Sequence, residues 1–214
     1  MQFVKEIFQE RVNEINRYYT FISSFSLENP DKELNKILRS NLILMLYNLV
    51  ESSITNSIEE IHSNIYTNRI SFNVLNIELK KILIRQIKNM NPHTFVQSIN
   101  DIAIDIIKQA FNKRQISDGN IDNDTIVKLG RQYGFCTFTN YQDTQSGRCL
   151  KAIKGRRNDL AHGTYSFTEI GKEYTIEDLG RMKNEAIKYL AEIIQNIELY
   201  LNSKSYILPE YIEH

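Results

Sequence analysis

The residues with the clearest chemical potential form one run, Arg157-Asn158-Asp159-Leu160-Ala161-His162. On a helix, Asn158 and His162 are four positions apart and therefore lie side by side on a polar face. Arg157 projects instead from the apolar side, where a guanidinium needs a counter-charge or an anionic ligand to offset its desolvation. The apolar stripe of this helix comprises Leu150, Ile153, Leu160 and Ala161, with Cys149 at its edge.

Glu51 is the carboxylate best placed in the sequence to pair with Arg157. It directly follows a nearly unbroken apolar run, residues 42–50, within a long and mostly apolar helical segment. A carboxylate at the end of such a run lies close to the core. We hypothesise that Glu51 holds Arg157 at the edge of a cleft.

Positive charge gathers on the segment that leads into this run. Its five basic residues are interrupted by no acidic residue, although the whole chain has 26 basic and 26 acidic residues and no net charge. Such a segment can bind phosphate locally. A basic helical face is also often merely solvated, and a histidine near a helix C-terminus is often structural. The five basic residues are Arg148, Lys151, Lys154, Arg156 and Arg157.

The elements that must position these residues are helices. Proline and glycine are scarce, with three and eight in the chain, and apolar residues recur at helical spacing. We therefore predict an all-α fold, one helical-bundle domain over residues 1–214 in which 71–115 is a helical elaboration. The predicted helices cover 3–28, 30–61, 74–90, 92–111, 125–133, 144–161 and 176–201, with a loop at 115–124 and a connector after Gly163.

Several functional classes are not expected from the sequence. The two cysteines, Cys136 and Cys149, show no zinc spacing, and Asp122 with Asp124 lacks the remaining ligands of a calcium loop, so we expect a solvated loop there, no metal site and no cofactor. No signal peptide or apolar stretch long enough for a membrane span is apparent. We expect a cytoplasmic protein.

The run from Arg157 to Gly163 resembles the R-x4-6-H motif of the HEPN superfamily, including the polar residue that follows the arginine. Flanking features are similar to small prokaryotic HEPN proteins of toxin–antitoxin and antiviral loci, whereas residues 71–115 show no such similarity. These features lie at 41–52, 150–154, 166–167, 174–175 and 178–179.

This resemblance implies a metal-independent endoribonuclease, in which the ribose 2′-OH attacks the adjacent phosphate and leaves a 2′,3′-cyclic phosphate. In that role His162 would act as base or acid, and Arg157 would bind the nonbridging oxygens with help from Lys154. Asn158 would orient the imidazole or hydrogen-bond the substrate. Glu51 and Asp159 are the predicted supporting residues. The predicted RNA contacts are Lys151, Lys154, Arg156 and Tyr165, the last as a stacking surface in the connector.

Two proton transfers require two acid–base groups, whereas the motif supplies one histidine, and the other three have no comparable setting. The resemblance implies a homodimer that builds one cleft from two motifs. An antitoxin or regulatory protein is a further expected partner. Two alternatives remain: a noncatalytic HEPN module that binds RNA, a nucleotide or a protein, and a helical adaptor in which Arg157 and Glu51 form a structural ion pair.

Overall fold

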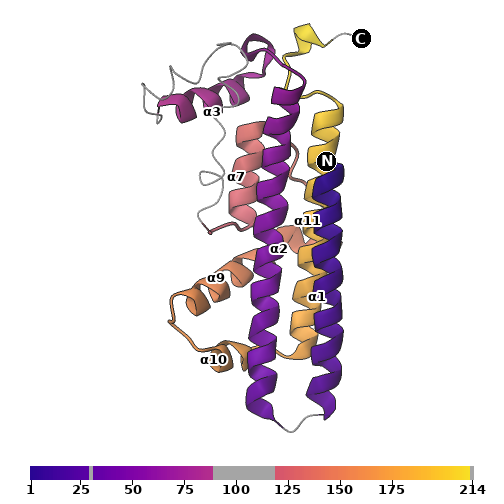
Figure 1. Ribbon diagram of the computed structural model, residues 1–214, viewed down its shortest axis with the longest axis vertical. Coiled ribbons are helices and arrows are strands. Elements are labelled where there is room, and N and C mark those ends of the chain that lie inside the picture. The colour runs from indigo at the N-terminus through magenta and orange to yellow at the C-terminus, as the bar shows by residue number, and fades with distance from the viewer. Residues whose placement is uncertain (29–30, 89–118, 213–214) are drawn as a thin grey trace.

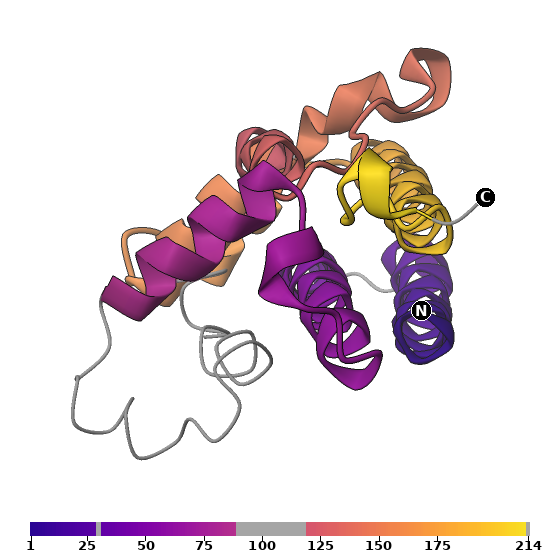
Figure 2. The ribbon, with the colours of Figure 1, turned by 90° about the horizontal axis from the view of Figure 1, so that it is seen from above.

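Three long helices form the body of the molecule. The computed structural model describes residues 1–28, 31–88 and 119–212. Helices α1 (Gln2–Glu28), α2 (Lys32–Thr67) and α11 (Ile176–Asn202) run alongside one another, and Figure 2 shows them end-on as three neighbouring rods. No strand occurs among the described residues. The predicted all-α helical bundle is confirmed.

Helix α2 is the central element, because α1, α9, α10 and α11 all pack on it (Figure 1). Its buried residues point to several sides, and the run over 42–50 at its centre is nearly all apolar. The Asp31 carboxylate caps its first turn by accepting hydrogen bonds from the backbone N–H groups of Glu33 and Leu34, each at 3.0 Å. The predicted start near Asp31 is therefore confirmed, while Pro30 lies outside the described residues.

The region between α2 and α11 contains shorter helices. A 3₁₀ turn over Phe72–Val74 precedes α3 (Ile77–Lys88), which lies across α7 (Asn123–Tyr133) and extends away from the bundle in Figure 1. The predicted helix over 92–111 and most of the predicted elaboration over 71–115 lie outside the described residues. After α11, the chain folds back to pair Ile207 with Leu75 and ends in a 3₁₀ turn, Pro209–Tyr211.

The predicted continuous helix over 144–161 is wrong. The chain instead forms α8 (Tyr141–Thr144), a 3₁₀ turn over Gln145–Gly147 and α9 (Cys149–Ala161). All three residues of the turn have positive φ angles, which end a right-handed helix. At Gly147 a Cβ atom would lie 2.8 Å from the ring of Tyr189, so this turn follows the surface of a buried aromatic side chain.

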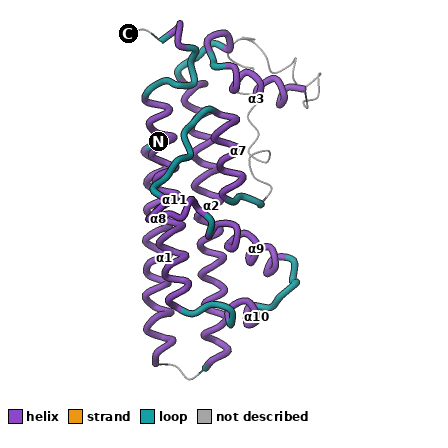
Figure 3. The backbone as a smooth tube through the Cα atoms, turned by 180° about the vertical axis from the view of Figure 1, so that it is seen from behind, coloured by secondary structure: helices purple, strands orange, loops and turns teal. Residues whose placement is uncertain are grey.

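The connector after Gly163 also contains an element that we did not predict, the short helix α10 (Phe167–Gly171). It opens with a capping box, in which Ser166 accepts from the Glu169 N–H and the Glu169 carboxylate accepts from the Ser166 N–H. Helices α9 and α10 project together from the side of the bundle (Figures 1 and 3). The hydroxyl of Ser40 on α2 donates to the Phe167 carbonyl at 2.5 Å and holds α10 in place.

Gly171 tests this packing of α10 on α2. A Cβ atom at Gly171 would overlap the backbone carbonyl of Lys36, whereas one at Gly155 on α9 would meet nothing within 4 Å. We expect Gly171→Ala to lower the free energy of unfolding by about 1–3 kcal/mol. The control Gly155→Ala, in an open helical position, should raise it by up to about 1 kcal/mol. Urea unfolding measures both, and equal stabilities for the two variants would contradict the packing described.

Candidate functional site

Arg157 lies between α9 and α2, on the core side as predicted. Its guanidinium stacks over the ring of Tyr47, with the central carbon 4.4 Å from the ring centroid. Nη1 donates to the backbone carbonyl of Gly119 at 3.1 Å and to Oδ1 of Asn158 at 2.9 Å. Nη2 lies 3.9 Å from the Glu51 carboxylate. The predicted proximity of Glu51 is thus confirmed, at ion-pair distance and beyond hydrogen-bond length.

Asn158 extends this arrangement to the surface. Its Oδ1 accepts from Arg157, and its Nδ2 donates to Oδ1 of Asn120 at 3.1 Å. The four polar side chains of Glu51, Arg157, Asn158 and Asn120 therefore form a connected series from α2 across α9. Both halves of the Asn158 amide are engaged, which fixes the orientation of its side chain.

His162 occupies the C-terminal cap of α9. Its backbone N–H donates to the carbonyl of Asn158 at 2.9 Å, and its side chain is exposed. Gly163 follows with a φ of 68°, a conformation that glycine adopts without strain and that ends the helix, as predicted. The imidazole therefore sits one helical turn beyond Asn158, at the free end of a helix that projects from the bundle (Figure 1).

Ala161 does not complete the apolar stripe as expected. Leu150 and Ile153 are buried and Leu160 is partly buried against the core, but Ala161 is exposed. The last turn of α9 extends past the bundle, so there is no core for Ala161 to face.

Lys154 is held by the fold. Its ammonium pairs with the carboxylate of Asp122, which also accepts hydrogen bonds from the N–H and hydroxyl of Thr125, both at 2.9 Å, and so caps α7. Burial opposes ionisation of Asp122, but the hydrogen bonds from Lys154 and Thr125 outweigh it and lower the pKa of this carboxyl group. Our expectation of a solvated loop at Asp122 is wrong, because its side chain is buried.

Arg156 is likewise paired within the chain. Its guanidinium contacts the carboxylate of Asp159 at 3.2 Å and that of Glu173 at 2.5 Å, and Nε donates to the hydroxyl of Tyr174 at 3.4 Å. Arg156 therefore joins α9 to the segment after α10, while Asp159, predicted as a supporting residue, pairs with the same guanidinium from within α9. The charges of Lys154 and Arg156 are matched internally, and their contacts with RNA stay a prediction.

Lys151 and Tyr165 are the two predicted contact residues with open side chains. Lys151 is exposed and forms no ion pair with a described residue. Tyr165 is 44% exposed just beyond His162, so a planar ring is available beside the motif. Phe167 in the same connector is also exposed by about a third, at 36%.

Sequence reasoning missed Tyr47, Gly119 and Asn120. Tyr47 is four residues before Glu51 on the same helix, so the two share a face, and this spacing could have identified it. Gly119 and Asn120 belong to a segment predicted only as a loop, and no local signal indicates that their polar groups meet residues nearly forty positions later.

His62 lies away from the motif and, unlike His162, is buried. It lies buried between α2 and α7, where Nε2 is 2.9 Å from the hydroxyl of Tyr133, and burial lowers its pKa to about 4. His93 and His214 lie outside the described residues. Among the described histidines, His162 alone is exposed.

His62 makes stability depend on pH in a defined direction. A buried neutral imidazole stabilises the fold fully above its unfolded pKa of about 6.5, and this contribution is lost as the pH falls from there towards about 4. We expect the stability advantage of wild type over His62→Gln in urea unfolding to shrink by about 2 kcal/mol between pH 7.5 and pH 5. An advantage that stays constant over this range would show that His62 titrates normally in the folded protein.

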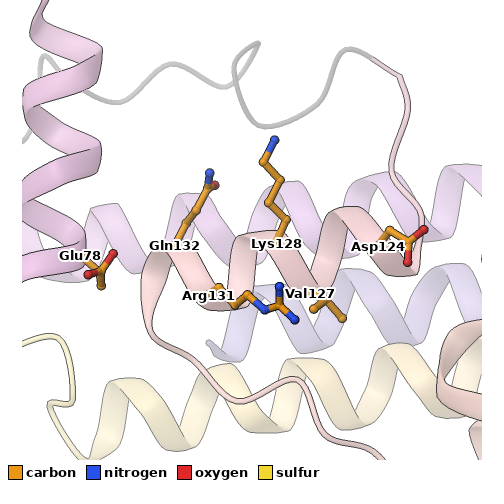
Figure 4. Close-up of a pocket in the computed structure, with 6 residues that line it drawn as sticks. All are labelled: Glu78, Asp124, Val127, Lys128, Arg131 and Gln132. Carbon is orange, nitrogen blue, oxygen red and sulfur yellow. The ribbon is translucent and has the colours of Figure 1, made fainter.

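A separate hollow of about 440 Å³ lies between α3 and α7 (Figure 4). Its lining includes two basic residues, Lys128 and Arg131, and two acidic ones, Glu78 and Asp124, and none of its lining residues belongs to the motif. Over the described parts of the chain, no group of three metal-binding side chains comes together, and no helix has the length and apolar composition to cross a membrane. Lys128 is therefore a useful control position for surface charge.

The comparison with protein families gives one match. The model of a family described as MAE_28990-like HEPN matches residues 3–206. The matched range includes α2, α9 and the residues from Arg157 to His162. No curated protein and no solved structure matches the chain significantly.

Proposed function

The chain belongs to the MAE_28990-like HEPN family, and from this membership we propose that it is a metal-independent endoribonuclease. One observation carries the proposal beyond membership. Arg157 is anchored on Tyr47 and presents Asn158, while His162 is exposed one turn further along the same helix. A guanidinium and an imidazole thus lie within two turns of the same helix, and this pair of groups supports the proposal of cleavage by the 2′-OH.

In the proposed reaction, His162 moves a proton to or from the substrate. As a base it takes the proton of the 2′-OH, and as an acid it protonates the leaving 5′ oxygen. Arg157 uses Nη1 for its two hydrogen bonds, which leaves Nη2, on the Glu51 side, to stabilise a nonbridging phosphate oxygen. Glu51 holds the guanidinium in position, and its 3.9 Å separation does not occupy that donor with a hydrogen bond.

We further propose that the active form is a homodimer. One motif supplies one exposed histidine, whereas cleavage needs a base and an acid at the same phosphate. A two-fold axis near the free end of α9 would bring two copies of His162 to one substrate. The projection of α9 and α10 from the bundle leaves this end accessible to a second subunit (Figure 3).

We propose that the biological role is that of a toxin or antiviral effector controlled by a partner protein. Cleavage of cellular RNA arrests growth, so such an enzyme requires an antitoxin or an activating signal. The alternative is a noncatalytic HEPN module. One observation favours this alternative. Lys154 and Arg156 pair with carboxylates of the same chain, which reduces the positive charge that is available to bind RNA.

Replacing His162 tests the proposed activity. We expect the wild-type protein to cleave a mixed RNA pool in the presence of EDTA, and His162→Ala to cleave it about 10²–10⁴-fold more slowly, because the proton-transfer group is lost. Gel electrophoresis of end-labelled RNA measures the rates. Lys128→Gln, which changes an exposed charge away from the motif, should retain full activity. Binding of RNA by both proteins without cleavage would favour the noncatalytic module.

Dilution tests the proposed dimer. If two motifs form each site, the activity per subunit should fall when the protein is diluted below its dimer dissociation constant. Analytical ultracentrifugation and cleavage assays over the same concentration range should therefore show the same midpoint. A protein that is monomeric at every assay concentration and still fully active would rule out the two-motif site.

A further inference from the structure

One side of α9 carries a line of residues that leads to His162, in which Arg148, Lys151 and His162 are exposed and Gly155 and Asn158 are half-buried. Arg148, Lys151, Gly155, Asn158 and His162 are spaced by three, four, three and four positions, so they follow one face of the helix. Arg148, whose φ and ψ of −55° and −33° are helical, continues the helix in register at its start. Lys151 to His162 spans about 16 Å along the helix axis.

Gly155 lies in the middle of this line and has no evident role in the fold. Glycine inside a helix destabilises it by up to about 1 kcal/mol relative to alanine. Gly147 and Gly171 each avoid an overlap with a neighbouring group, but a Cβ atom at Gly155 would meet nothing within 4 Å. A glycine at position 155 is therefore explained best by a group from outside the subunit that passes close to the backbone of α9 and that a side chain would obstruct.

The charges on this face indicate what that group is. Lys151 is exposed with no ion pair to a described residue, and Arg148 is exposed above the ring of Tyr141, 5.9 Å from its centroid. No acidic residue lies on α9 before Asp159, whose carboxylate is engaged by Arg156. Two open cations on one side of Gly155 and the motif on the other favour an extended anionic chain over a neutral surface.

We propose that a single RNA strand runs along α9, with its sugar–phosphate backbone closest to the helix at Gly155. Flanking phosphates bind Lys151 and Arg148, and the scissile phosphate lies beside Asn158 and His162. This inference rests on the proposed ribonuclease function and specifies its substrate as a single-stranded segment several nucleotides long. Tyr141, half-exposed beneath Arg148, marks the far end of the track.

Gly155→Ala separates this role from a structural one. Because the added methyl group has free space within the subunit, the variant should be at least as stable as wild type in thermal unfolding. If RNA passes over Gly155, the same variant should bind a single-stranded oligonucleotide about tenfold more weakly. Binding is measured in a His162→Ala background by fluorescence anisotropy, so that cleavage does not interfere.

Two charge variants complete the test. Lys151→Gln should weaken binding and reduce the slope of log affinity against log salt concentration by about one, whereas Gly155→Ala should leave the slope unchanged. The control Lys128→Gln should change neither affinity nor slope.

The binding results test the RNA track, and the cleavage results test the proposed ribonuclease activity. Unchanged oligonucleotide binding by Gly155→Ala would overturn the track, and so would a loss of dimerisation in that variant, because a second subunit would then be the approaching group. If wild type cleaves no RNA, the proposed activity fails. The binding measurements still decide whether RNA follows α9.

Discussion

The stacking of Arg157 on Tyr47 is the interaction on which the site depends. A guanidinium stays charged, so a position between two helices requires compensation on each side. The Tyr47 ring, the Gly119 carbonyl and the Glu51 carboxylate supply it from α2 and from the segment before α7. The same contacts dock α9 on the bundle. Arg157, the proposed phosphate-binding residue, is therefore also a structural anchor that holds α9 on the bundle.

This anchor explains why the segment before α7 is part of the site. The Ile121 N–H donates to the Tyr47 hydroxyl at 3.3 Å, so the ring beneath Arg157 is itself held by that segment. Asn120 then holds Asn158, and Asp122 holds Lys154. The contacts from Asn120 and Asp122 thus fix one side of α9, while the pair between Arg156 and Glu173 fixes the other. Only the outermost face and the free end of α9 stay open.

The same contacts neutralise most of the positive charge on α9. Of the five basic residues that lead into the motif, Lys154 and Arg156 pair with carboxylates, and Arg157 lies near one. The segment that looked like a phosphate-binding surface in the sequence is therefore mostly a structural ion-pair network. The other two, Arg148 and Lys151, form no ion pair with any residue that the structure describes, and both are exposed. A small positive surface in a neutral chain is consistent with local binding of a short strand.

The sequence predicted the features that depend on local patterns. Periodicity identified the long helices, and the end of the apolar run singled out Glu51. Features that depend on distant partners were not predictable. Nothing local indicates that Gln145 and Ser146 adopt positive φ beside Tyr189, or that Asp122 is buried because Lys154 reaches it. The Ser166 capping box was readable, but the helix it starts is only five residues long.

The chemistry of the product ends tests the central claim most directly. Wild-type protein incubated with a single-stranded RNA in EDTA should leave 2′,3′-cyclic phosphate and 5′-hydroxyl ends, because the ribose 2′-OH is the proposed nucleophile. Mass spectrometry of the fragments, with and without enzymatic opening of the cyclic phosphate, identifies these ends. Fragments with 3′-hydroxyl and 5′-phosphate ends would show that water attacks the phosphate, and would contradict the role assigned to Arg157 and His162.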